Sequence, residues 1–137
     1  MWWIYALLSA LFAALTAIFV KLGVEKMDSD LATAIRTLVI LLITWAIVFF
    51  KGVVTTIPVL SSKNWLFLIL SGIATGLSWL FYFRAIQLGK VSQVAPIDKL
   101  SLSLVLIFSV IFLGETLTPK VILGASLIIA GTFVIIL

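Results

Sequence analysis

The chain has 137 residues, of which 64% are hydrophobic and only 10% are charged, and its mean hydropathy is +1.39. Soluble domains usually carry about 25% charged residues, so this composition excludes an ordinary soluble domain and indicates an integral membrane protein. The absence of Cys and His excludes a disulfide framework, a Cys/His metal site and any mechanism that uses an imidazole base or a thiolate nucleophile.

The net charge of +4 is carried by single cations at the edges of apolar blocks, which favours interface and loop lysines over a nucleic-acid partner. The blocks are long and do not alternate with polar residues, so they predict spanning helices rather than an outer-membrane barrel. We therefore expect an all-α integral membrane protein that lies in a lipid bilayer. Its single domain, residues 1–137, should contain five spans, at about residues 2–20, 31–50, 64–84, 94–113 and 119–137.

The first two spans differ in charge. Residues 2–20 are uncharged, and they are expected to be a retained helix because Met1-Trp2-Trp3 lacks the basic region of a signal peptide. The second span follows Asp28-Ser29-Asp30, which offers N-cap oxygens. Its one charge is Arg36, about a turn and a half inside. That side chain either snorkels back to the headgroups or faces the helix bundle as a functional cation.

The third span follows a polar connector at residues 51–63, and Ser61 or Ser62 can cap it. It contains a small-xxx-small motif of the kind that lets helix backbones touch, although packing inside one subunit would use the same surface. The last span has a similar small-residue face. The helix-packing candidates are Gly72, Gly76, Gly124 and Gly131.

Turn and cap residues separate the later spans. Gly89 is predicted to end the third span as a left-handed C-cap within a polar turn at residues 84–93. Gly114 and Glu115 should close the fourth span, with Glu115 a solvated loop acid. Thr118-Pro119 then reads as an N-cap followed by proline at the first helical position of the fifth span.

Asp98 and Lys99 are the most informative charges, and their meaning depends on where the fourth helix begins. If it begins at Ser92, Pro96 lies in its interior and kinks it, and Asp98 lies well inside the membrane as a candidate proton or cation site. If Ala95 is the cap and Pro96 the first helical residue, Asp98 is an ordinary first-turn acid stabilised by the helix dipole. The sequence leaves both alternatives open.

Folding about the turn brings Arg84 within reach of Asp98, so these two could form a pair that holds both charges in low dielectric. Lys99 would then remain available to an anionic ligand or a headgroup. Trp79, Tyr82 and Phe81 could line a substrate cavity by stacking or cation–π contact, or anchor at the interface. The substrate or coupling candidates are Asp98, Lys99, Arg36, Arg84, Trp79 and Tyr82. No phosphate loop, dinucleotide turn or Ser/base constellation is present, so neither an enzyme nor a cofactor is expected.

Several of these motifs together resemble a known family. They are Tyr-Phe-Arg-Ala at 82–85, Gly89, Val-Ser-Gln-Val-Ala-Pro at 91–96, Phe-Leu-Gly-Glu at 112–115, Gly124, Gly131, and Ala-Ile-Arg-Thr at 34–37. In this combination the full length of the chain is similar to the EamA domain of the drug/metabolite transporter superfamily.

The resemblance implies a five-helix unit, two of which normally form one ten-helix transporter chain as inverted repeats. This chain has a single unit, so it would need a partner of opposite orientation, from an antiparallel homodimer or a paired half-size subunit. The related small multidrug resistance proteins achieve this by dual topology and carry a glutamate in the first helix. Residues 2–20 contain no acid, so proton coupling through that position is not implied here.

The loop cations permit dual topology. With the amino terminus inside, three lysines face the cytoplasm and four cations face outward, or six if Arg36 and Lys99 are included. We therefore predict a multi-pass subunit of a secondary active transporter in the plasma or inner membrane. It should act as an antiparallel homodimer that moves a small organic metabolite or drug by alternating access. A lipid-carrier flippase subunit and a non-transporting membrane scaffold are the alternatives.

Overall fold

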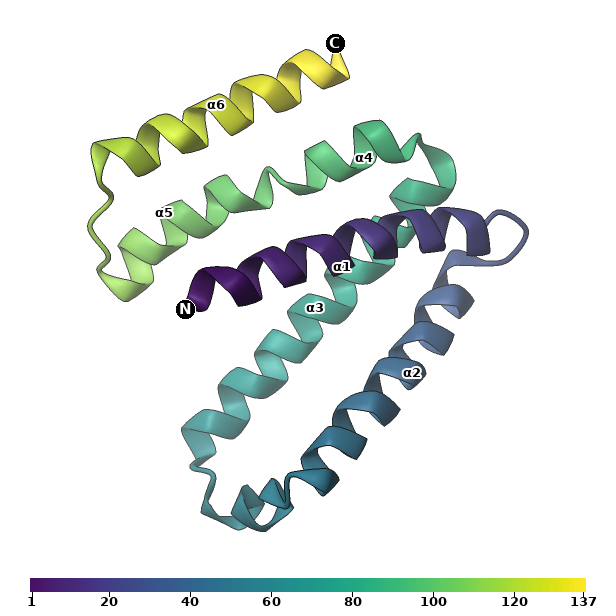
Figure 1. The fold of residues 1–137 in the computed structure, drawn as a ribbon, viewed down its shortest axis with the longest axis vertical. Coiled ribbons are helices and arrows are strands. Elements are labelled where there is room, and N and C mark those ends of the chain that lie inside the picture. The colour runs from purple at the N-terminus through teal and green to yellow at the C-terminus, as the bar shows by residue number, and fades with distance from the viewer. The chain divides into compact units, whose positions relative to one another are not determined.

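The computed structural model describes residues 1–137, and all its regular structure is helical (Figure 1). The elements are α1 (Trp2–Gly23), α2 (Ser29–Phe50), the 3₁₀ helix η1 (Val53–Val59), α3 (Ser62–Leu88), α4 (Val91–Asp98), α5 (Ser101–Leu113) and α6 (Pro119–Ile136). Five segments are long and apolar enough to cross a membrane, and α4 and α5 together make the fourth. The all-α fold and the five spans are confirmed.

The chain divides into two compact units. One is Ile18–Leu88, which holds the end of α1 with α2 and α3. The other combines Met1–Ala17 with Gly89–Leu137, and in it α6 packs against α4 and α5.

In the Ile18–Leu88 unit, α2 packs against α3, and η1 connects them. The Asp28 carboxylate caps α2 by accepting hydrogen bonds from the backbone N–H of Asp30 at 2.9 Å and of Leu31 at 3.1 Å. Phe83 and Ile86 on α3 are almost completely buried. The buried positions of this unit therefore lie toward the end of α3, near the loop that follows α1.

In the other unit, the predicted caps around α5 and α6 are confirmed. Gly114 adopts a left-handed φ of 67°, and the N–H groups of Gly114 and Glu115 both reach back to the Ser109 carbonyl, so α5 ends on a left-handed glycine cap. Thr118 caps α6 through a bond from Val121 N–H, and Pro119 takes the first helical position. A sharp turn between the last two spans follows from these residues.

The predicted start of the polar turn at Arg84 is wrong, because the helix α3 continues to Leu88. The left-handed C-cap at Gly89 stays a prediction. Arg84, Ala85, Gln87 and Leu88 are good helix formers, so the helix does not end at Arg84.

Of the two alternatives for the start of the fourth helix, the structure shows the one that has Pro96 in the helix interior, so Asp98 is not a first-turn acid. The helix α4 starts at Val91, contains Pro96 in its interior and ends at Asp98, with Lys99 as its C-cap. Bonds from Lys99 N–H to the Pro96 carbonyl at 3.1 Å and from Leu100 N–H to the Ile97 carbonyl at 3.0 Å tighten the chain into a break before α5. Because proline has no N–H, Pro96 removes one hydrogen bond from α4, and the helix ends two residues later at Asp98.

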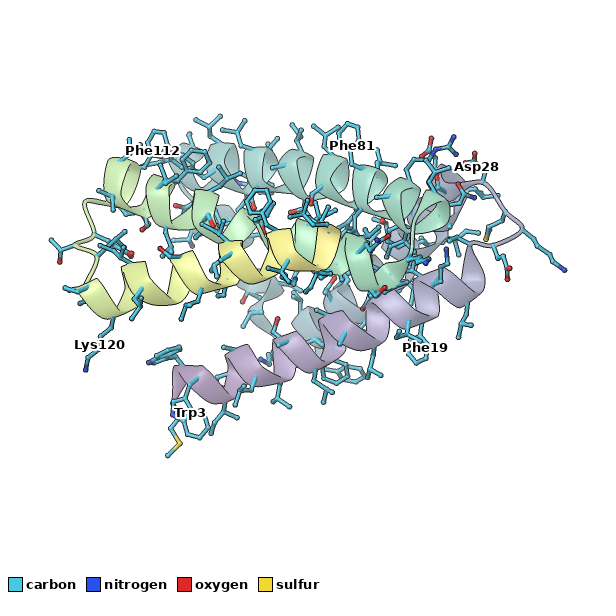
Figure 2. The ribbon with its side chains drawn as sticks, turned by 90° about the horizontal axis from the view of Figure 1, so that it is seen from above. Trp3, Phe19, Asp28, Phe81, Phe112 and Lys120 are labelled. Atoms are coloured by element: carbon cyan, nitrogen blue, oxygen red, sulfur yellow. The ribbon has the colours of Figure 1, made fainter.

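Most large apolar side chains project outward from the helices. Phe81 is 74% exposed and Phe112 is 77% exposed, and Figure 2 shows both directed away from their helices. Such faces suit the hydrocarbon of a bilayer, where apolar groups need no burial inside the protein.

Candidate functional site

The Arg36 side chain on α2 lies over two aromatic rings of α3. Its guanidinium carbon is 4.3 Å from the centroid of the Trp79 ring and 5.2 Å from that of Phe83. Trp79 and Phe83 are four residues apart, so they share one face of α3. The packing of α2 against α3 therefore brings one cation onto two ring faces.

Arg36 lies inside a spanning helix and not at its end. It is seven positions after Ser29, the first residue of α2, which corresponds to about 10 Å along the axis. A cation at such a depth is costly unless it is solvated, paired or stacked. The aromatic faces supply part of that compensation, because a cation–π contact contributes about 0.5–2 kcal/mol depending on desolvation.

The rings do not satisfy the hydrogen-bonding capacity of Arg36. The Nη1 atom is buried and has no hydrogen-bond partner in the protein. Lys99 forms an ion pair with Asp98, and this pair does not involve Arg36. A guanidinium carries five N–H donors along its edge, so a ring stacked on its face leaves those donors available to an acceptor. Tyr82 lies close enough to interact electrostatically with Arg36.

Of the two alternatives for Arg36, the structure has the side chain facing α3 within its own unit. It brings together three of the predicted candidates, Arg36, Trp79 and Tyr82. Phe81 is exposed and projects outward from its helix. Phe83, which the sequence reasoning missed as a site residue, is 2% exposed and lies under the guanidinium. The four-residue spacing from Trp79 was the signal that could have identified it.

Asp98 and Lys99 lie in the other unit, at the break between α4 and α5. The Lys99 ammonium is 3.4 Å from the Asp98 carboxylate, and the two side chains are 62% and 35% exposed. In the same unit Thr132 on α6 donates hydrogen bonds to the Ile128 carbonyl at 2.9 Å and the Pro96 carbonyl at 3.5 Å. The charged pair therefore lies at a discontinuity of a spanning helix, a place where backbone groups are less regularly bonded.

Arg84 donates a hydrogen bond to the Gln87 side chain at 3.1 Å. Gln87 in turn donates to the carbonyls of Val24 at 3.2 Å and Met27 at 2.8 Å, which fastens the first loop to the end of α3. Lys21 adds a bond to the Ile86 carbonyl at 2.9 Å. The sequence reasoning missed this anchor, since an amide in a predicted turn gives no sign of its partners. The predicted Arg84–Asp98 pair would join the two units and stays a prediction.

The four helix-packing candidates make no close contact within their own units. A Cβ atom built on any of them would meet no other atom within 4 Å beyond its own helix backbone; they are Gly72, Gly76, Gly124 and Gly131. Their roles in packing inside the subunit and in contacts with another subunit stay predictions.

Comparison with known proteins shows the family to which this chain belongs. The EamA-like transporter family matches residues 1–137. A protein of Sinorhizobium sp. named as an uncharacterized transporter in the cobO 3' region is 52% identical over 134 residues, which cover 98% of this chain and 95% of that protein. An uncharacterized protein of Methanocaldococcus jannaschii is 27% identical over 93% of this chain and 90% of its own length. No solved structure matches.

Proposed function

Because this chain belongs to the EamA-like transporter family, we propose that it is a subunit of a secondary active transporter that moves a small organic metabolite or drug by alternating access. The observation that carries the proposal is the match of a transporter family to the whole chain. The resemblance between this chain and a protein named as a transporter supports the same class. Transport requires no covalent chemistry, which agrees with a sequence that lacks any nucleophile and base constellation.

The active form is an antiparallel homodimer. Transporters of inverted-repeat architecture place the substrate between two repeats of opposite orientation, and this chain supplies one set of five spans. The relatives of similar length indicate that a single-repeat chain recurs. The open glycine faces at Gly72 and Gly76 can accept a close helix from a second copy.

Within this dimer, two groups of side chains are the substrate or coupling sites. Arg36, Trp79 and Tyr82 form the first group, on α2 and α3. Asp98 and Lys99 form the second, at the break between α4 and α5. Both groups lie within spans, where ionisable residues most often face substrate or ion pathways.

The odd number of spans gives a direct test. Five spans put Met1 and Leu137 on opposite sides of the membrane, so a short linker from the end of one copy to the start of the next produces an antiparallel tandem. Inserting one additional spanning helix in the linker produces a parallel tandem from the same two copies. Both fusions are reconstituted into lipid vesicles, and the uptake of labelled organic anions, cations and neutral solutes is measured.

The antiparallel tandem is expected to take up at least one class of solute faster than protein-free vesicles, and the parallel tandem is expected not to. Equal uptake by both fusions would contradict the antiparallel dimer. Uptake by neither fusion, nor by the untethered chain, would contradict transport and favour the scaffold. Transport by the Asp98→Asn, Lys99→Ala double variant at the unaltered rate would remove that pair from the site.

A further inference from the structure

The geometry at Arg36 points to the chemical class of the ligand: a small organic anion whose carboxylate or phosphate head binds the guanidinium held on Trp79 and Phe83. The binding site is assigned from the chain's own contacts. The assignment rests on the proposed function only where it calls this anion the transported substrate. A binding measurement on purified protein therefore separates the two claims.

The first step is that the charge of Arg36 is not balanced by a carboxylate of its own unit. Within Ile18–Leu88 the carboxylates are Glu25, Asp28 and Asp30, and none is ion-paired with Arg36. Asp28 is already used to cap α2, and Asp30 is six residues before Arg36, about 9 Å along the helix. A cation held inside a spanning helix needs compensation. An anion from outside the unit supplies the charge that its side chains do not.

The second step is the unbonded Nη1 atom of the guanidinium. Trp79 and Phe83 contact Arg36 through their rings, and Nη1 has no hydrogen-bond partner in the protein. The planar fork of N–H donors matches the two oxygens of a carboxylate or phosphate, whereas an ammonium acts as a point charge. A buried donor left unbonded is costly, and more so on a charged group, so the site favours a ligand that accepts hydrogen bonds.

The third step is preorganisation. Phe83 is 2% exposed and therefore fixed by its neighbours, and Trp79 stands one turn away on the same helix. Stacking on these two rings restricts the long arginine side chain before any ligand arrives, which lowers the entropy cost of binding. A side chain that served only to reach the headgroups would need no such support.

The probes are benzoate, phenyl phosphate and benzamide. Benzamide matches benzoate in size and shape but is neutral. Purified wild-type protein in a neutral detergent is heated with each probe, and the unfolding temperature is recorded, because a ligand that binds the folded state stabilises it. Benzoate or phenyl phosphate is expected to raise the unfolding temperature in a saturable manner, and benzamide is expected to leave it unchanged. Equal shifts with all three probes, or no shift with either anion, would overturn the assignment.

Two variants locate the site, and one is the matched control. Arg36→Met should abolish the anion-dependent shift, and Arg36→Lys, which keeps the charge but loses the planar fork, should weaken binding by about tenfold or more. Lys63→Gln removes an exposed cation of α3 and should bind as wild type does. If Arg36→Met does not fold, the Arg36→Lys variant and the benzoate–benzamide contrast in the wild type still decide the outcome. An undiminished shift in the folded Arg36 variants would overturn the proposal.

The same head chemistry is present in lipids, so a second arm separates the sources. The unfolding measurement is repeated in nanodiscs of phosphatidylcholine with and without phosphatidylglycerol. A soluble-anion ligand predicts that benzoate still shifts the unfolding temperature in discs that contain phosphatidylglycerol. An Arg36-dependent shift with phosphatidylglycerol and none with the soluble anions would overturn the soluble ligand and assign the site to a lipid headgroup. Anion binding without flux would contradict the transporter but not the binding site. Flux that is unchanged in the Arg36 variants would contradict the binding site but not the transporter.

Discussion

Replacing Gln87 tests whether its amide fastens the first loop to the end of α3. The Gln87→Met side chain has nearly the same length but cannot donate to the carbonyls of Val24 and Met27, which now accept at 3.2 and 2.8 Å. A typical hydrogen bond contributes about 0.5–1.5 kcal/mol net. Loss of both bonds should therefore lower the free energy of unfolding by about 1–3 kcal/mol.

The global effect is measured by unfolding in detergent micelles with increasing SDS, followed by far-ultraviolet circular dichroism. Gln93→Met is the matched control, because Gln93 is exposed and its side chain makes no hydrogen bond in the protein. The two variants lose the same amide, so their difference isolates the anchor. Equal stability of Gln87→Met and Gln93→Met would refute the reasoning.

A local measurement exploits the absence of native cysteine. Val24 is 2% exposed, so a thiol introduced by Val24→Cys should react slowly with a soluble maleimide. Adding Gln87→Met should speed that labelling several-fold, because the loop opens more often when its carbonyls lose their donors. Labelling at an unchanged rate would show that other contacts hold the loop.

Three further predictions follow from the helix breaks and the open faces. Pro96→Ala restores a backbone N–H inside α4 and should slow amide hydrogen exchange at Lys99 several-fold, and an unchanged rate would contradict the role of proline in the break. Gly114→Ala forces a left-handed φ of 67° on alanine and should lower the free energy of unfolding in SDS by about 1–2 kcal/mol. The control Gly76→Ala, measured in dispersed monomers, should lower it by no more than a few tenths of a kcal/mol. Equal losses in the two variants would contradict the strain at Gly114. Gly76→Leu should reduce disulfide cross-linking between a copy that carries Lys26→Cys and a second copy that carries Lys51→Cys, because an antiparallel dimer places these two loops on the same side of the membrane. Undiminished cross-linking would remove this face from the dimer contact.

The caps were predictable from the sequence because each depends on residues that are neighbours in the chain. Asp28 before α2, Gly114 after α5 and Thr118-Pro119 at α6 all act within about four residues. The number of spans followed from the lengths of the apolar blocks. Local chemistry therefore determined most of the helix boundaries.

The start of α4 was not predictable in this way. Pro96 is acceptable both at the first position of a helix and, at a cost, in its interior, and the choice depends on whether the preceding residues continue the helix. In the structure Val91 to Ala95 are helical, so Asp98 falls at the end of α4 and beside the break.

The residues around Arg36 could not be predicted from its neighbours in the sequence. The residue was identified from its charge alone, but its partners lie more than 40 positions away on α3. The four-residue spacing of Trp79 and Phe83 predicts a shared face and does not specify which cation that face meets. The packing of α2 against α3 supplies the missing partner, and the same holds for Gln87 and the loop carbonyls.

The central claim is that this chain forms a transporter whose ligand binds at Arg36, and benzoate uptake into proteoliposomes tests it most directly. Wild-type protein and Lys63→Gln are expected to show saturable uptake above that of protein-free vesicles, and Arg36→Met is expected to match the protein-free vesicles. Wild-type uptake no faster than in protein-free vesicles, or Arg36→Met uptake as fast as in the wild type, would contradict the account.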